Sequence, residues 1–307
     1  MRSRKKYVSH SQLRKYRECP ERWSLHYRER LRPDDASIHF IYGTASHEVV
    51  QTFLRNHFEE RSTPDLPGLL RKHMAAEFRA DREDFEGPEF PISQEDMTYF
   101  LKRGSEILEF FKSRVGDFFD PSSEEIVGIE YRLDAPFKQN VHWIGYIDLL
   151  LKTNDGRYRI VDLKTSKKGW DRYKKRDNKV TDQLLFYKHF FHVQQDVPLD
   201  RIDVEYLIFS MEGTPTLEVF QPDDTDLDDA LGVLDEFVSE AFTLDGSRYS
   251  QKDLPKQPGK WNCCFCPYST DFGEPGYQVC DMKGRTYDDY PDSMEPYVPN
   301  RFLKKSS

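Results

Sequence analysis

The stretch from His142 to Ser166 constrains the fold of this 307-residue chain more than any other. Two apolar runs flank Asn154-Asp155-Gly156, a sequence that strongly favours the turn of a β-hairpin. Three charged residues interrupt these runs: Asp148 in the first, and Asp162 and Lys164 in the second. Because side chains alternate across a strand, Asp162 and Lys164 share one face, and closing the hairpin can bring Asp148 alongside them.

Charged groups inside an apolar strand must be paired or bind a metal, because burying an isolated charge is costly. Two carboxylates and an ammonium group at this place could hold a divalent cation and position a water molecule beside it. The alternative is that Asp162 and Lys164 form a simple ion pair on a solvated face, since the D-x-K pattern is short and common. The rest of the chain bears on this choice.

The chain is long enough for one large domain with a sizeable core. Aromatic residues make up 14% of it, which favours a folded protein over a disordered one. No apolar run is long enough to span a bilayer, and the N-terminus has no signal-peptide pattern. We therefore expect a soluble, cytoplasmic protein without a membrane partner.

Positive charge is concentrated in two segments, although the net charge is -9. Residues 1–32 contain 11 Lys and Arg against 3 Asp and Glu, and residues 152–188 contain 12 against 5. Basic segments next to a carboxylate site would suit a polyanionic substrate, because phosphate contacts supply much of the affinity for nucleic acids. The alternative is that both segments are solvated, lysine-rich loops without a binding role.

Five cysteines are unevenly distributed along the chain. Cys19 lies near the start, and the other four lie in the last fifth, at Cys263, Cys264, Cys266 and Cys280. In an intracellular protein, this pattern favours metal ligation over disulfides.

The hydrophobic periodicity predicts an α/β core with a mixed sheet. The predicted strands cover residues 124–136, the two arms of the hairpin, 201–210 and 216–220. The predicted helices cover residues 40–58, 69–85, 93–118, 181–193 and 224–242. Thr181 is the predicted cap of its helix, in which Gln183 and Tyr187 lie four residues apart on one face. Glu130, in the first strand, either approaches the hairpin charges or lies on a solvated face.

Six short motifs, taken in order, resemble the PD-(D/E)XK nuclease superfamily. They are S-x-L-x-x-Y-x-x-C-P from Ser11 to Pro20, G-x-x-x-H from Gly43 to His47, G-x-I-D ending at Asp148, D-x-K at Asp162 and Lys164, Q-x-x-x-Y at Gln183 and Tyr187, and the terminal cysteines. Within the superfamily, the chain is most similar to the RecB-like branch, including CRISPR-associated RecB-like exonucleases and the AddB nuclease domain. The likeness spans about residues 8–210 and the cysteine region, and it leaves 60–120 unmatched.

The resemblance implies a restriction-endonuclease-like core within a single nuclease domain. That core would cover about residues 8–58 and 124–242, with a helical insertion at 60–120 and an irregular region at 243–307. The catalytic Mg²⁺ or Mn²⁺ would be bound by His47, Asp148, Asp162 and the backbone carbonyl of Leu163. Lys164 would orient or help to deprotonate the attacking water, while Gln183 and Tyr187 would support the site and the DNA. Oxygen ligands suit these hard cations, and a histidine shifts selectivity toward Mn²⁺.

The resemblance also implies a [4Fe–4S] cluster that joins the ends of the chain through Cys19, Cys263, Cys266 and Cys280. Cys263-x-x-Cys266 has a common ligand spacing. Two features depart from the family pattern: Cys264 is an extra candidate, and thirteen residues separate Cys266 from Cys280. A structural zinc ion held by four cysteines and a set of unligated thiols are the alternatives.

The sequence therefore predicts a DNA exonuclease that hydrolyses phosphodiester bonds through a metal-activated water, in DNA repair, recombination or processing. Its partner would be single-stranded DNA or duplex ends. An endonuclease of the same fold and a non-catalytic, DNA-end-binding scaffold are the alternatives. The chain contains no G-x-x-x-x-G-K-[ST] phosphate loop, so a helicase, recombination or CRISPR partner would have to supply unwinding.

Overall fold

The computed structural model describes most of the chain in two compact units. The described residues are 6–31, 36–85, 90–138, 140–223, 226–247, 249–259, 263, 266–268 and 280. One unit, called here the terminal unit, comprises Met1–Pro33, Asp134–Ile144 and Asp226–Ser307. The other, called the sheet unit, comprises Asp34–Leu133 and Gly145–Thr225.

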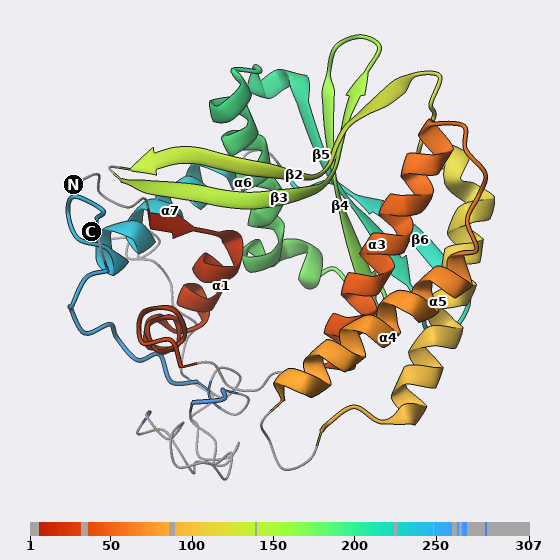
Figure 1. Ribbon diagram of the computed structural model, residues 1–307. Helices are drawn as coiled ribbons and strands as arrows, with labels where there is room; N and C mark the ends of the chain where they lie inside the picture. Colours follow the sequence, from red (N-terminus) through yellow and green to blue (C-terminus); the bar gives the residue numbers. More distant parts are fainter. Residues whose placement is uncertain are drawn as a thin grey trace. The chain divides into compact units, whose positions relative to one another are not determined.

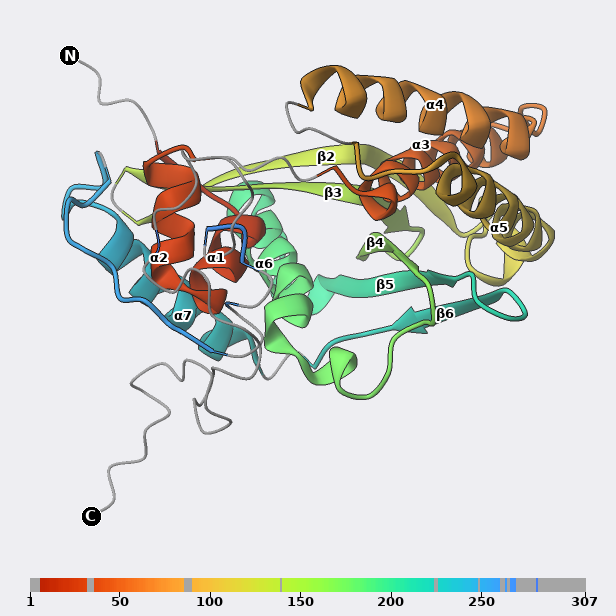
Figure 2. The ribbon, with the colours of Figure 1, turned by 90° about the horizontal axis from the view of Figure 1, so that it is seen from below.

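A mixed sheet forms the centre of the sheet unit, which confirms the predicted fold class (Figure 1). Its strands are β2 (Glu124–Lys138), β3 (Val141–Thr153), β4 (Tyr158–Ser166), β5 (Ile202–Ser210) and β6 (Thr216–Phe220). β2 pairs with β3, β3 and β4 are antiparallel, β4 and β5 are parallel, and β5 and β6 are antiparallel (Figure 2). All five strands were predicted from the sequence.

The predicted hairpin forms between β3 and β4. Gly156 adopts a φ of +82°, a left-handed conformation that glycine reaches without strain, and its N–H donates to the Thr153 carbonyl at 2.9 Å. The parallel step from β4 to β5 requires a crossover, which α6 (Asn178–Gln195) supplies. The predicted start of this helix was wrong, because Asp177 rather than Thr181 caps it, accepting the Lys179 N–H at 3.0 Å.

Helices α3 (Ile38–Phe58) and α5 (Gln94–Arg114) pack on one face of the sheet, and α4 (Leu66–Asp84) packs on these two helices (Figure 2). Alternate residues of the strands, among them Leu149, Val161 and Leu207, pack against these helices in one hydrophobic core. On α6, Phe191 packs its ring 5.1 Å from that of Tyr158. The central strands β4 and β5 are therefore buried.

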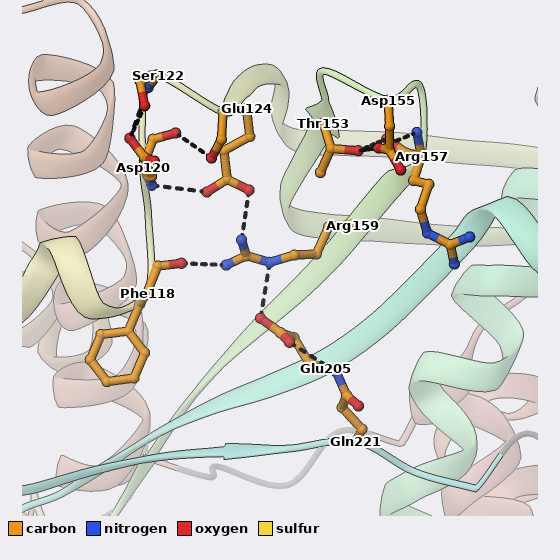
Figure 3. A network of polar contacts seen from close by, with 11 residues as sticks. Phe118, Asp120, Ser122, Glu124, Thr153, Asp155, Arg157, Arg159, Glu205 and Gln221 are labelled. Carbon is orange, nitrogen blue, oxygen red and sulfur yellow. Dashed lines mark hydrogen bonds and ion pairs between the residues drawn. The ribbon is translucent and has the colours of Figure 1, made fainter.

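Arg159 links three segments of the sheet unit at one end of β4 (Figure 3). Its guanidinium donates to Glu124 Oε2 at 2.6 Å, to Glu205 Oε1 at 3.0 Å and to the Phe118 carbonyl at 2.7 Å. Both glutamate side chains are largely buried. The network fixes the start of β4 against β2 and β5.

In the terminal unit, short helices enclose Trp23. The elements are β1 (Lys6–Val8), α1 (His10–Glu18), α2 (Pro20–Trp23), the π-helical turn η1 (Ser24–Arg28) and α7 (Leu227–Ala241). β1 pairs in parallel with the first residues of β3. The fully buried Trp23 ring lies 5.2 Å from Phe237 of α7.

Three single-turn helices complete the described elements: η2 (Val115–Asp117), η3 (Lys174–Arg176) and η4 (Leu199–Arg201). Within the described part of the chain, every helix is too short or too polar to span a lipid bilayer.

Candidate functional site

The candidate site lies in the sheet unit, where the backbone pairing of β3 and β4 ends. The paired register runs from Lys152 opposite Tyr158 to Leu149 opposite Val161. One further step would place Asp148 opposite Asp162. Instead, Asp148 Oδ2 accepts the Leu163 N–H at 2.7 Å, so a carboxylate takes the place of a ladder carbonyl.

Asp162 and Lys164 share a face of β4, and Leu163 packs in the hydrophobic core on the other side, as the alternation predicts. Asp162 Oδ2 lies 2.5 Å from Lys164 Nζ. The ion pair that the sequence left open therefore exists, but it is not on a solvated face, because the Asp162 side chain is only 2% exposed. The ammonium group is more accessible, with 28% of the Lys164 side chain exposed.

Helix α3 brings His47 to this pair of strands. His47 Nδ1 lies 3.5 Å from Asp148 Oδ2. One turn later on the same helix face, Gln51 Nε2 donates to the carboxylate of Glu130 at 2.6 Å and to the backbone carbonyl of Asp148 at 3.4 Å. The Gln51 contacts connect α3 with both β2 and β3.

Helix α6 contributes Gln183 and Tyr187 from the same face, as predicted. The Gln183 amide donates to the Tyr187 hydroxyl oxygen at 2.9 Å. Burial, with the charge of Asp162 beside it, raises the pKa of Tyr187 far above its ordinary value. The phenol therefore stays protonated and remains a possible hydrogen-bond donor.

The charges of the site are strongly coupled. Burial and the neighbouring charge of Asp148 outweigh the attraction of Lys164 and raise the pKa of Asp162 to about 6. Burial also opposes ionisation of Asp148, but His47, Lys164 and the Leu163 N–H outweigh it and lower the pKa of Asp148. Burial opposes the charge on His47 too, yet Asp148 raises the pKa of the imidazole. The positive charges of Lys164 and His47 thus do not fully offset the burial and mutual repulsion of the two carboxylates.

Sequence reasoning missed Gln51 and Tyr206, and it left Glu130 undecided. Gln51 had a usable signal, because it follows His47 by four residues on a helix. Glu130 is exposed and has a φ of +51°, a strained conformation for a residue within a strand. Tyr206 lies on β5, where its ring centre is 5.7 Å from Lys164 Nζ.

The donor set suits a hard divalent cation, because it combines carboxylates with an imidazole. In the part of the chain that the structure describes, no three His, Cys, Asp or Glu side chains are already close enough to hold a metal ion. The Leu163 carbonyl stays a predicted ligand.

Four of the five cysteines line one small cavity of the terminal unit: Cys19, Cys263, Cys266 and Cys280. Within the described residues, none of these four cysteines forms a disulfide. Backbone N–H groups of Gln257 and Gly259 each donate to a cysteine sulfur at 3.4 Å. Burial raises the pKa of the Cys19 and Cys263 thiols. The remaining candidate, Cys264, lies outside the described residues.

Comparisons with known proteins give one family and distant structural likenesses. The family profile described as the PD-(D/E)XK nuclease superfamily matches residues 7–270. A crystal structure of a candidate exonuclease from Eubacterium rectale is 13% identical, with a TM-score of 0.46 over 75% of this chain and 78% of that one. The structure of SSO0001 is 12% identical, with a TM-score of 0.31 over 78% of this chain and 98% of that one. No curated protein matches the chain.

Proposed function

Because the chain belongs to the PD-(D/E)XK nuclease superfamily, we propose that it is a metal-dependent exonuclease that degrades DNA from its ends. The observation that carries this proposal is the buried Asp162, which pairs with Lys164 while a second carboxylate, Asp148, contacts both His47 and the adjacent backbone. The preference for DNA ends follows from the RecB-like order of the sequence motifs.

His47, Asp148, Asp162 and the Leu163 carbonyl would hold Mg²⁺ or Mn²⁺, the ions that this superfamily generally uses. When bound, such a cation would polarise the scissile phosphate and lower the pKa of a coordinated water. The raised pKa of Asp162 supports this assignment, because it indicates a site that lacks positive charge. The Leu163 N–H would hold Asp148 in a fixed orientation.

Lys164 would orient the attacking water and stabilise the negative charge that builds on the phosphate oxygens. The protonated hydroxyl of Tyr187, oriented by Gln183, would donate to the DNA or to the attacking water. Gln51 would position the site by tying α3 to the backbone of Asp148. None of these roles requires a covalent enzyme intermediate.

Basic residues within 1–32 and 167–179 are the proposed phosphate contacts, because salt-sensitive phosphate contacts dominate DNA affinity. Since the chain has no phosphate loop for nucleotide hydrolysis, a helicase or a recombination or CRISPR partner would supply unwinding. Roles in DNA repair, recombination or processing fit an end-directed nuclease.

Cys19, Cys263, Cys266 and Cys280 are the proposed ligands of a [4Fe–4S] cluster. Their shared cavity and the N–H groups that point at two of the sulfurs support the proposal, because such hydrogen bonds are typical around cluster thiolates. Zinc is the rival occupant. Anaerobic purification followed by iron, sulfide and zinc analysis distinguishes them. Equal metal content in the wild type and Cys266→Ala would exclude both sites.

Digestion of singly end-labelled DNA with Mg²⁺ or Mn²⁺ tests the nuclease itself. We expect Lys164→Ala to lower the cleavage rate by about 10²-fold or more, the usual cost of losing a group that stabilises developing charge. Lys112→Ala on α5, where the lysine pairs with Glu109 of the same helix, is the matched control and should cleave normally. Cleavage of closed circles would identify an endonuclease, and binding without cleavage in the wild type would identify a scaffold.

A further inference from the structure

The segment between β4 and α6, residues 167–177, is here called the basic loop (Figure 2). It contains six lysines and arginines and two aspartates. Both aspartates are engaged with backbone N–H groups: Asp171 accepts from Tyr173 and Lys174, and Asp177 caps α6. The two carboxylates therefore fix the backbone of the loop, and the lysine and arginine side chains make its surface positively charged.

Trp170 anchors the basic loop beside the candidate site. Its side chain is 6% exposed, and its ring centre lies 4.9 Å from that of Tyr206 on β5. The Tyr206 ring also contacts the candidate site, because Lys164 Nζ lies 5.7 Å from its centre. On the loop side, Lys174 Nζ lies 4.9 Å from the Trp170 ring. One aromatic side chain thus separates the loop anchor from Lys164.

Tyr173, in the same loop, is 70% exposed. A single exposed aromatic residue would need no explanation by itself. Here, however, the Arg172 guanidinium lies 4.8 Å from the ring centre and also donates to the Tyr173 hydroxyl at 2.9 Å. The Asp171 turn fixes the backbone of the same residue. The exposed ring therefore lies against a guanidinium group, within a loop rich in lysine and arginine.

We propose that Tyr173 is a stacking platform for an unpaired base of the DNA strand that enters the candidate site, while the surrounding lysines and arginines contact its phosphates. This rests on the proposed function. Aromatic rings bind single strands by stacking on any base, and basic side chains beside them follow the backbone. Bases in a duplex are already stacked on each other, so this contact selects single-stranded DNA or frayed ends.

The test compares two fluorescent oligonucleotides of equal length and charge, a thymidine 20-mer and its abasic counterpart, by anisotropy in EDTA. We expect Tyr173→Ala to weaken binding of the thymidine strand about 5- to 150-fold, the usual range for one stacked base. Binding of the abasic strand should not change. Tyr173→Phe, which keeps the ring, should bind as the wild type does.

Two control variants and a melting experiment separate base stacking from charge and from folding. Tyr99→Ala removes another exposed tyrosine, which lies on α5, and should have no effect. Lys167→Ala in the basic loop should weaken binding of both strands and reduce the salt dependence, whereas Tyr173→Ala should leave that dependence unchanged. The melting temperature of Tyr173→Ala should equal that of the wild type, because the side chain is mostly exposed.

Equal affinities of Tyr173→Ala and the wild type for the thymidine strand would overturn the inference. An equal loss on both strands would overturn it too, because the tyrosine would then act without a base. If the wild type stacks the thymidine strand but cleaves no DNA with Mg²⁺ or Mn²⁺, the proposed function fails and the stacking platform stands. A wild type that binds neither strand would overturn the inference, and the cleavage assay with Mg²⁺ or Mn²⁺ would then decide the proposed function separately.

Discussion

Removing the Arg159 side chain should destabilise the sheet unit far more than removing Arg157, the arginine that immediately precedes β4. The substitution Arg159→Ala would leave the carboxylates of Glu124 and Glu205 without their cation (Figure 3). These side chains are 4% and 11% exposed, so water cannot solvate them fully. An uncompensated buried charge typically costs about 3–5 kcal/mol of unfolding free energy.

The expected loss lies near the lower end, at about 3 kcal/mol, because each glutamate keeps one other hydrogen bond. Glu124 still accepts the Asp120 N–H at 3.3 Å, and Glu205 still accepts the Gln221 amide at 3.2 Å. Urea unfolding at pH 7, followed by circular dichroism, measures this loss. The m-value should stay unchanged, because the same surface is exposed on unfolding.

Arg157→Ala is the matched control. Arg157 also pairs with a carboxylate of β5, Asp203, but these side chains are 33% and 47% exposed. A solvent-screened pair of this kind contributes little to the free energy of unfolding. A triple variant that replaces Arg159, Glu124 and Glu205 by apolar residues should recover much of the loss, since no charge is left unpaired. Equal losses for Arg159→Ala and Arg157→Ala would refute the reasoning.

Two further predictions concern the candidate site. The pKa of Asp162 is raised from 3.8 to about 6, so the folded, metal-free protein binds a proton that the unfolded chain releases, and stability falls as the pH rises through this range. In urea unfolding at a series of pH values, metal-free Asp162→Asn should lack this fall, and its free energy of unfolding at pH 7 should be higher by up to about 3 kcal/mol. Added Mg²⁺ should stabilise only the wild type. Parallel pH profiles of the two proteins would contradict this prediction. Gln51→Leu should raise the Mg²⁺ concentration needed for half-maximal cleavage and change the rate at saturating Mg²⁺ less, because the Gln51 amide positions Asp148. An unchanged metal requirement would show that Gln51 is only structural.

The sequence was most informative where short-range chemistry decides the structure. The turn at Gly156 and the alternation of Asp162, Leu163 and Lys164 both depend on neighbours in the chain, and both appear in the structure as predicted. The start of α6 was misplaced for a local reason as well. Asp177 stands in a run of charged residues that hid its capping role, so Thr181 looked like the stronger cap.

Contacts between distant segments could not be predicted in the same way. Gln51 and Glu130 lie 79 residues apart, and their hydrogen bond depends on a left-handed residue in the middle of a strand. Glu130 is neither glycine nor asparagine, the residues that usually signal such a conformation. The two side chains meet only because α3 packs against the sheet. Hydrophobic periodicity does not specify the angle at which a helix packs.

The candidate site depends on the position at which β3 and β4 separate. Ideal hairpin pairing would set Asp148 and Asp162 opposite each other, with like charges side by side, and this is unfavourable. In the structure this repulsion is partly offset because Asp148 accepts the Leu163 N–H, and a hydrogen bond to a carboxylate is stronger than one to a neutral carbonyl. The ladder bond that the strands lose is thus replaced by a stronger one, and His47 can approach Asp148 at the point where the pairing stops.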